Sequence, residues 1–316
     1  MRCSIPLPTV SSRLESTSLV RIAILSDIHA NLAALEAVMA HAEANKVERY
    51  ISLGDVVGYG PDPVECVDIV AAKCDWSLLG NHDCAVLYEP TNFNEVAKRA
   101  AYWTRDAIMQ RHLVEAAALD AKISSGLLAA TDPMVSQERV RIERDRMRRL
   151  DFINMMPVRK RFDRYVAVHG TLRKYINEYL FPQDAAQYPR KMRDIFSLIP
   201  DGCTLFVGHT HWPGVFSRDY DDFVFESPAD LENVWMVPDA SEVEAPEELK
   251  AIVNPGSVGQ PRDGDPRASY AILDTSGPRH KIEFHRVEYD AQKTCDRIFA
   301  NEQLDRWLGE RLLEGR

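Results

Sequence analysis

The first ninety residues repeat one pattern three times: a short apolar run stops abruptly at a polar motif. The runs cover residues 20–25, 50–53 and 76–79, and the motifs after them are Ser26-Asp27-Ile28-His29, Gly54-Asp55 and Gly80-Asn81-His82-Asp83. Such runs are typical of fully buried strands. The spacing from Asp27 to Asp55 is 28 residues and that from Asp55 to Asn81 is 26, about the length of one βαβ unit. Because right-handed crossovers keep such strands parallel, we expect the three motifs to meet at one edge of a sheet.

The segments between these runs have the spacing of helices. The first helix is expected to begin with Asn31 as its N-cap and to run to about residue 44. The second is expected to use Asp62 as its N-cap and Pro63 in the first helical position, with Glu65 closing an arrangement like a capping box. A strand end that is followed at once by a helix is where open α/β sheets place their ligands.

Two later apolar runs end in histidines, at His169-Gly170 and at Gly208-His209-Thr210-His211. The strand ends therefore supply carboxylate, amide and imidazole groups, which suit Mn, Fe, Zn, Co or Ni better than a thiolate-built zinc site would. Seven ligands are too many for one ion with an open position, whereas two ions that share a carboxylate account for all of them. One isolated Asp-X-His pair would be interpreted as a surface pair, but its repetition at successive strand ends favours a metal site. Four histidines have no comparable context: His41, His112, His280 and His285.

Composition restricts the partners and the compartment. The chain of 316 residues carries a net charge of -10, which disfavours nucleic acid as a partner because such binding depends on a basic surface. The six cysteines form no CxxC pair, so we expect reduced thiols in a cytoplasmic protein. Residues 1–18 lack the apolar stretch of a signal peptide and are expected to be a disordered leader or sequence upstream of the true start. No apolar run is long enough to predict a membrane span.

The rest of the chain is expected to form one domain over residues 19–290, with no separate boundary. Helices are predicted over 93–111 and 112–156, the latter broken at Gly126 and at Asp132-Pro133, and short strands dominate after His211. The β-rich half predicts a second sheet stacked on the first. A last helix over about 291–313 has an apolar stripe, for which packing on its own domain is the simpler interpretation and a homodimer contact the alternative.

In this order, the five motifs resemble the signature of the calcineurin-like metallophosphoesterases over about residues 20–290. The resemblance implies a four-layer αββα sandwich, an α/β fold in which two stacked mixed sheets are flanked by helices, and a site for two divalent or mixed-valence ions. It further implies that Asp27, His29 and His211 bind the first ion, that Asp55 bridges, and that Asn81, His169 and His209 bind the second. His82 would be the non-ligand histidine that protonates the leaving group or steadies the transition state.

Two glycine- and proline-rich segments, 58–63 and 254–262, resemble the small bacterial and archaeal phosphodiesterase-like branch of that superfamily. Two other segments, near 115–150 and 217–248, depart from this compact branch and are interpreted as insertions. The implied activity is hydrolysis of a small phosphodiester or phosphomonoester by a hydroxide that bridges the metals. Substrate contacts are predicted for Arg173, Arg262 and Tyr59.

Three alternative functions remain. A Ser/Thr protein phosphatase would place Asp-Arg-Gly just after the bridging aspartate and a Glu at the end of the third motif, but this chain has Val56-Val57-Gly58 and Asp83 there. A dinucleoside-polyphosphate hydrolase is disfavoured in the same way. A non-catalytic scaffold ranks last, because every ligand position is present. Without the phosphate-gripping arginine in its expected place, we expect small diesters to be cleaved better than phosphoseryl peptides.

Overall fold

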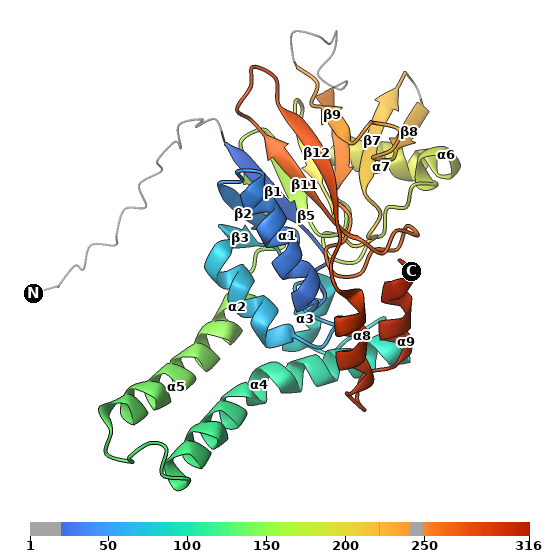
Figure 1. The fold of residues 1–316 in the computed structure, drawn as a ribbon. Helices are drawn as coiled ribbons and strands as arrows, with labels where there is room; N and C mark the ends of the chain where they lie inside the picture. Colours follow the sequence, from blue (N-terminus) through green and yellow to red (C-terminus); the bar gives the residue numbers. More distant parts are fainter. Residues whose placement is uncertain (1–19, 221, 240–248) are drawn as a thin grey trace, which may run out of the picture.

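The computed structural model describes residues 20–220, 222–239 and 249–316, so the predicted leader and part of the segment 217–248 lie outside the described residues. Two six-stranded mixed sheets form the centre of the molecule (Figure 1). The first sheet has the order β3 (Trp76–Ser77), β2 (Arg49–Ser52), β1 (Arg21–Leu25), β11 (Ala268–Asp274), β12 (Lys281–Val287) and β9 (Val234–Met236). The second has the order β4 (Arg159–Phe162), β5 (Tyr165–Val168), β6 (Thr204–Phe206), β10 (Ala251–Asn254), β7 (Gly214–Asp219) and β8 (Asp222–Glu226).

The parallel arrangement predicted for the first three strands is confirmed in the first sheet, and the second sheet contains a further parallel group. Strand β1 pairs in parallel with β2, and β2 with β3, while β5, β6 and β10 form a parallel group in the second sheet. The helices are α1 (Leu32–Ala44), α2 (Pro63–Lys73), α3 (Asn81–Leu87), α4 (Glu95–Ser124), α5 (Pro133–Asn154), α6 (Asp184–Gln187), α7 (Pro189–Leu198), α8 (Ala291–Phe299) and α9 (Trp307–Glu310), with a 3-10 turn η2 at Arg311–Leu313. None of the described helices combines the length and the apolar character needed to cross a bilayer.

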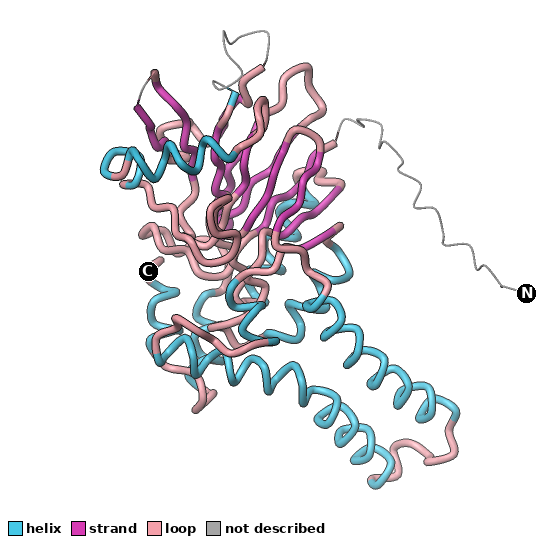
Figure 2. The backbone as a smooth tube through the Cα atoms, turned by 180° about the vertical axis from the view of Figure 1, so that it is seen from behind, coloured by secondary structure: helices cyan, strands magenta, loops and turns pink. Residues whose placement is uncertain are grey.

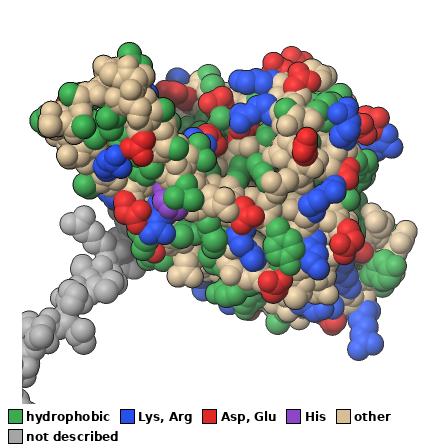
Figure 3. Space-filling view, turned by 90° about the horizontal axis from the view of Figure 1, so that it is seen from below, with side chains coloured by type: hydrophobic (Ala, Val, Ile, Leu, Met, Phe, Trp, Pro, Cys, Tyr) green, Lys and Arg blue, Asp and Glu red, His purple; other side chains and the backbone are tan. Residues whose placement is uncertain are grey.

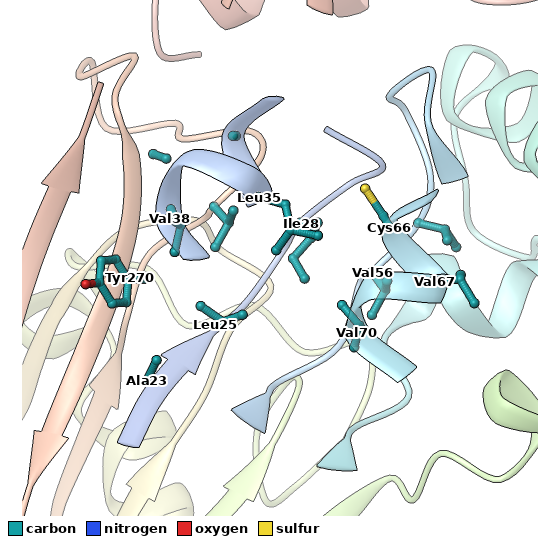
Figure 4. Packing of buried hydrophobic residues seen from close by; sticks show 14 of the residues in the cluster. Ala23, Leu25, Ile28, Leu35, Val38, Val56, Cys66, Val67, Val70 and Tyr270 are labelled. Atoms are coloured by element: carbon teal, nitrogen blue, oxygen red, sulfur yellow. The ribbon is translucent and has the colours of Figure 1, made fainter. Parts of the chain in front are cut away.

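Three apolar clusters define the four layers. In the first cluster, Leu35 and Val38 of α1 and Val67 of α2 pack on Ala23 and neighbouring residues of the first sheet (Figure 4). The second cluster fills the space between the two sheets, and the third joins α7 to the outer face of the second sheet. The fold is thus the predicted αββα sandwich, in which alternate faces of each strand serve different clusters.

Helices α4 and α5 form a hairpin that projects away from the sheets (Figures 1 and 2). Charged side chains pair along α5: Arg141 bonds Glu138 at 2.7 Å and Asp145 at 3.0 Å. Basic and acidic side chains also alternate over the face seen from below (Figure 3). At the base of the hairpin the buried Arg149 binds Asp68 of α2 through two bonds, of 2.9 and 2.8 Å. This pair attaches the projecting hairpin to the domain.

The C-terminal segment differs from the continuous helix predicted over 291–313. Helix α8 ends at Phe299, and a second short helical stretch begins only at Trp307. The predicted apolar stripe is buried between both pieces and the first turns of α4, beside which α8 and α9 lie in Figure 1. The chain folds back at this break because Ile298, Leu304, Leu308 and Leu312 then reach one cluster, which contains Ala100.

Of the two predicted helix caps, one was wrong and the other is confirmed. Asp62 precedes α2 as expected but makes no side-chain capping bond, and its carboxylate instead pairs with Arg297 of α8. Between Asp184 and Leu198 the chain forms two helices, since α6 ends before Tyr188 and Pro189 begins α7. Asn31 caps α1 as predicted, since its side chain accepts a bond from the N–H of Ala34 at 3.2 Å.

Candidate metal centre

The polar motifs meet in loops at the carboxyl ends of the parallel strands, between the strands and the lower helices (Figure 2). Backbone bonds join the loops after β1 and β2: the N–H of Asp27 donates to Gly54 at 3.0 Å and that of His29 to Asp55 at 2.9 Å. A third bond joins Gly259 to the carbonyl of Asp27 at 3.0 Å. The loops therefore form one interlocked unit around the motif side chains.

Three groups of buried side chains could each hold a metal ion. They are Asp27 with His29 and His211; Asp55 with His169 and His209; and His29 with Asp55 and His82. The first two groups match the predicted division of ligands, and the third shows that geometry alone also permits His82 as a ligand. Asn81 joins the second group, because its Oδ1 lies 3.3 Å from Nε2 of His169.

Asp55 lies between the first two groups. Its Oδ2 is 3.7 Å from Nε2 of His29 and 3.3 Å from Nε2 of His169, while its Oδ1 accepts the backbone N–H of His82 at 2.8 Å. Asp27 takes a similar position near Nε2 of His211, at 3.3 Å. The two carboxylates thus separate clusters of imidazoles inside a buried pocket.

Main-chain carbonyls orient three of the histidines. The Nδ1–H of His29 donates to Val57 at 3.2 Å, that of His169 to Leu53 at 2.9 Å and that of His211 to the carbonyl of Gln260. A carbonyl only accepts, so each of these rings holds a proton on Nδ1 and turns its Nε2 atom into the site, where a deprotonated Nε2 can bind an ion. Such outer bonds are usual for histidines that ligate metals.

Two further features fit a cation at this place. The Nε2 atoms of His29 and His211 lie 3.2 Å apart, and two lone pairs at that distance repel unless a positive charge lies between them. The buried Nε2 of His209 has no hydrogen-bond partner among the described residues. The donor set consists of oxygen and nitrogen atoms, which suits divalent ions of the first transition series and zinc.

Burial and the charges of neighbouring groups together shift the pKa values of the carboxylates and histidines of the site. Burial raises the pKa of Asp27 and of Asp55, but the neighbouring histidines outweigh it and hold both carboxylates below their usual range. Burial lowers the pKa of His82 to about 4 and, with the charge of His169, that of His209 to about 3. The site without metal therefore keeps both carboxylates ionised at neutral pH.

Glycines allow the loops to approach closely. A Cβ atom on Gly80 would lie 2.1 Å from Oδ1 of Asp55, and one on Gly208 would lie 2.1 Å from Oγ of Ser26. Neither neighbour is the end of a flexible chain that can move aside easily. The two glycines are needed for the carboxylates to reach the histidines.

Of the three predicted substrate contacts, two lie near the site. The ring of Tyr59 is 4.2 Å from that of His82 and 4.8 Å from that of His29, and Cζ of Arg262 is 6.0 Å from the Tyr59 ring. Arg173 instead pairs with Glu178 at 3.2 Å and with Asp194 at 3.3 Å. Its charge is therefore already neutralised, and a contact with substrate stays a prediction.

Sequence reasoning missed the positioning role of Asp83 and two aromatic side chains. The buried carboxylate of Asp83 accepts the N–H of Val56 and that of Gly80, each at 3.0 Å, and so holds the second and third motifs together. The ring of Tyr179 stacks on His209 at 3.8 Å, and that of Phe93 lies 4.7 Å from His82. Asp83 had a sequence signal, because it ends a recognised motif, whereas the aromatic residues come from loops without one.

The interlocked strand-end loops, with buried carboxylates between imidazoles on an αββα sandwich, define a metal-dependent phosphoesterase. The sequence profile of the calcineurin-like phosphoesterases matches residues 20–231, and the chain belongs to this family. It is 34% identical to an uncharacterized protein of Methanocaldococcus jannaschii over 93% of this chain and 98% of that protein. It is 32% identical to a metallophosphoesterase from Sphaerobacter thermophilus, whose crystal structure aligns over 95% of this chain and 100% of the other with a TM-score of 0.67.

A hypothetical protein of Pyrococcus horikoshii shares the fold, with 18% identity, a TM-score of 0.57 and coverage of 94% and 99% of the two chains. The chain is accordingly a metallophosphoesterase, a hydrolase of phosphoric esters that depends on metal.

Proposed function

We propose that the protein hydrolyses a small phosphodiester or phosphomonoester at a centre of two metal ions. Asp27, His29 and His211 would hold one ion, and Asn81, His169 and His209 the other. Asp55 would bridge them. The observation that carries the proposal is the position of Asp55, whose Oδ2 lies within 3.7 Å of Nε2 of His29 and 3.3 Å of Nε2 of His169, one histidine from each group.

Two ions in such a site, of the kinds Mn, Fe, Zn, Co or Ni, would activate a water molecule at neutral pH and neutralise charge on the phosphoryl oxygens. The chain itself supplies orientation, because carbonyl bonds fix the rings of His29, His169 and His211. It also excludes solvent, since each of these rings is at most 1% exposed. An electrostatic interaction with a reacting phosphoryl group is stronger in such a dry site.

We assign to His82 the donation of a hydrogen bond to the leaving oxygen. Its Nδ1 is buried and finds no hydrogen-bond partner in the part of the chain that the structure describes, and its ring is held between Tyr59 and Phe93. Burial lowers the pKa of His82 to about 4, so the ring is neutral near pH 7 and carries one N–H. Of the two roles considered for this residue, this favours steadying the transition state over full proton transfer.

Small substrates are favoured because aromatic side chains cover the imidazoles. Tyr59 lies against His29 and His82, and Tyr179 lies against His209. A phosphorylated protein segment needs an open groove at the reacting atoms, whereas a small ester can enter between side chains. The protein Ser/Thr phosphatase and dinucleoside-polyphosphate hydrolase functions remain second to this reading, and the scaffold function last.

The test is a substrate screen at matched metal loading. The purified protein, loaded with Mn²⁺, would be assayed with an aryl phosphodiester, an aryl phosphomonoester, a cyclic nucleotide and a phosphoseryl peptide. We expect about two metal ions per chain and a higher kcat/KM for at least one small ester than for the peptide. A tenfold preference for the peptide would favour the protein phosphatase function, and a loaded protein that cleaves no ester would favour the scaffold.

We also propose a reducing compartment, such as the cytoplasm, because Cys66, Cys74, Cys84, Cys203 and Cys295 are free thiols. A homodimer through the C-terminal segment stays a prediction. Most of the apolar stripe of that segment is buried on its own domain, and the large apolar side chains exposed there are Trp307 and Leu313, at 48% and 46%.

A further inference from the structure

Among the predicted histidine ligands, His209 differs in how its ring is held. His29, His169 and His211 each donate from Nδ1 to a main-chain carbonyl, whereas the ring of His209 makes no hydrogen bond within the part of the chain that the structure describes. Its main chain is fixed, because its N–H donates to Oδ2 of Asp27 at 3.0 Å. The Cβ–Cγ torsion of histidine has a broad preference, so another contact must select the orientation that binds an ion.

The ring of Tyr179 makes that contact. It lies on the imidazole of His209 with the centroids 3.8 Å apart and the planes within 19° of parallel. The ring of His169 lies 5.0 Å from the same imidazole at an angle of 57°. Turning the imidazole would drive its edge into the tyrosine ring, which packs at van der Waals distance. The stack can therefore replace the carbonyl bond that the other three histidines have.

A lysine of α7 fixes the backbone that carries Tyr179. Nζ of Lys191 donates to the carbonyl of Tyr179 at 2.7 Å and to Oδ2 of Asp184 at 2.6 Å. The same carboxylate oxygen accepts the N–H of Phe181 at 2.8 Å. The Phe181 ring also lies 5.3 Å from that of Tyr179, with the planes within 8° of parallel. These contacts on the C-terminal side of Tyr179 keep its ring over His209.

The loop that carries Tyr179 begins directly after His169, another predicted ligand of the second ion. The N–H of Gly170 donates to the carbonyl of Tyr175 at 2.6 Å, so the loop folds back on its own start. One loop thus carries a predicted ligand at its start and, further along, the ring that covers another ligand of the same ion.

We propose that Tyr179 is a positioning residue of the second metal site, which holds the imidazole of His209 in the orientation that binds the ion. Lys191 acts through Tyr179, because it fixes the backbone on which that ring stands. This inference rests on the proposed division of ligands between two ions. It goes beyond that division, since two residues outside the five sequence motifs then determine the affinity for one ion and not for the other.

The first test measures metal binding to the full-length protein, by calorimetric titration of the metal-free protein with Mn²⁺. His209→Ala identifies the binding event of the second ion, because this variant should lose that event. We expect Tyr179→Leu to raise the Kd of the same event about tenfold or more, as is usual when a group that orients a metal ligand is lost, and to leave the other event unchanged. Tyr179→Phe keeps the flat ring and should keep the wild-type Kd.

Tyr188→Leu is the matched control. Tyr188 lies in the same connection between β5 and α7 and is 55% exposed, so its loss should leave both Kd values unchanged. An unchanged Kd of the second ion in Tyr179→Leu would overturn the proposal. An equal rise for both ions would also overturn it, since this indicates a general loosening of the fold. A higher KM for a small ester at unchanged metal affinity would do the same, because Tyr179 would then contact the substrate.

The second test combines Tyr179 with Lys191, whose ammonium group lies outside the metal centre. We expect Lys191→Met to raise the Kd of the second ion about threefold, the effect of one lost hydrogen bond. The double variant with Tyr179→Leu should bind no more weakly than Tyr179→Leu alone, because both changes release the same ring. Additive effects of the two substitutions would overturn the role of Lys191.

These measurements separate the role of Tyr179 from the proposed function. If the loaded protein cleaved no ester, the phosphoesterase activity would fail as a proposal, while the metal titrations would still decide the role of Tyr179. If His209→Ala left both binding events intact, the division of ligands would be wrong and this inference with it. If His209→Ala abolished one event and Tyr179→Leu left that event unchanged, only the role of Tyr179 would be rejected.

Discussion

Metal binding should release a proton from His169. Burial lowers the pKa of this histidine. The charge of Asp55, a hydrogen bond to Asp55 and the charge of Asp27 outweigh burial and raise the pKa to about 9 in the site without metal. His169 is therefore protonated at neutral pH, with Nε2–H directed to Asp55 at 3.3 Å. A ligand must be neutral imidazole, so an ion that binds there displaces this proton.

The size of the effect follows from that pKa. With a pKa of about 9, His169 is about 0.97 protonated at pH 7.5 and about 0.24 protonated at pH 9.5. The number of protons released should thus fall by about 0.7 between the two pH values. The pKa values of His29, His209 and His211 are lowered by burial, so these histidines are already neutral and contribute none. Asp83, whose pKa burial and Asp55 raise to about 7, adds at most about 0.2 proton in the same direction.

The same competition between a proton and the ion for His169 determines how metal affinity changes with pH. Below pH 9 the proton competes with the ion, so affinity for the ion at His169 should rise about tenfold per pH unit and level off above pH 9. Titration calorimetry of metal-free protein with Mn²⁺, under anaerobic conditions and in two buffers of different ionisation enthalpy, gives the number of protons at each pH. A water that ionises on binding releases more protons at the higher pH, because the pKa of metal-bound water is about 7, so it can reduce the expected fall but cannot produce one. A proton release that is the same at pH 7.5 and 9.5 would refute the reasoning.

Three substitutions test other parts of the structure. Asp55→Ala should remove both ions, because this carboxylate lies between both groups of ligands; two ions per chain in the variant, by metal analysis, would reject the bridging role. His82→Ala should keep its metals and lose activity by about 100- to 1,000-fold, as for the loss of one hydrogen-bond donor to a reacting oxygen, and a variant within about threefold of wild type would exclude the role in the reaction. Arg149→Met should lower the free energy of unfolding, measured in urea, by about 1–3 kcal/mol. This is less than the loss expected for a fully buried ion pair, because Asp68 is half-exposed. Arg148 is exposed, and Arg148→Met should change the free energy of unfolding by less than about 0.5 kcal/mol.

The strands that carry the metal ligands could be predicted from the sequence to within one or two residues at their ends. Their apolar runs are buried on both sides, and polar motifs end them sharply, so local pattern and tertiary environment agree. Strand β4, Arg159–Phe162, was not predicted, because three of its four residues are charged. It is an edge strand, and its pairing with β5 comes from main-chain hydrogen bonds that charged side chains do not prevent.

The parts of the site that could not be predicted depend on contacts between distant segments. Leu312 reaches the cluster that contains Tyr59 only because α8 ends at Phe299 and the chain turns back, a break that helical periodicity does not reveal. In the same way, the contact of Asp62 with Arg297 replaced an expected helix cap. An aspartate at a helix start can either cap the helix or form an ion pair. The local sequence does not decide between the two, because the arginine that forms the pair lies far along the chain.

The backbone of the site indicates that the ligands are positioned before any ion arrives. Asp27, His29, Asp55, His209 and His211 all have positive φ, from 50° to 67°, a conformation that costs L-residues roughly 1–2 kcal/mol each. Such strain persists only where the surroundings over-determine it. Here the surroundings are the main-chain bonds between the strand-end loops and the carbonyl bonds to the histidine rings. The loops are also closely packed where they meet at glycines. These contacts form within the protein and need no metal. The free energy of folding therefore offsets the strain of the ligand backbone, and the free energy of metal binding is not reduced by it.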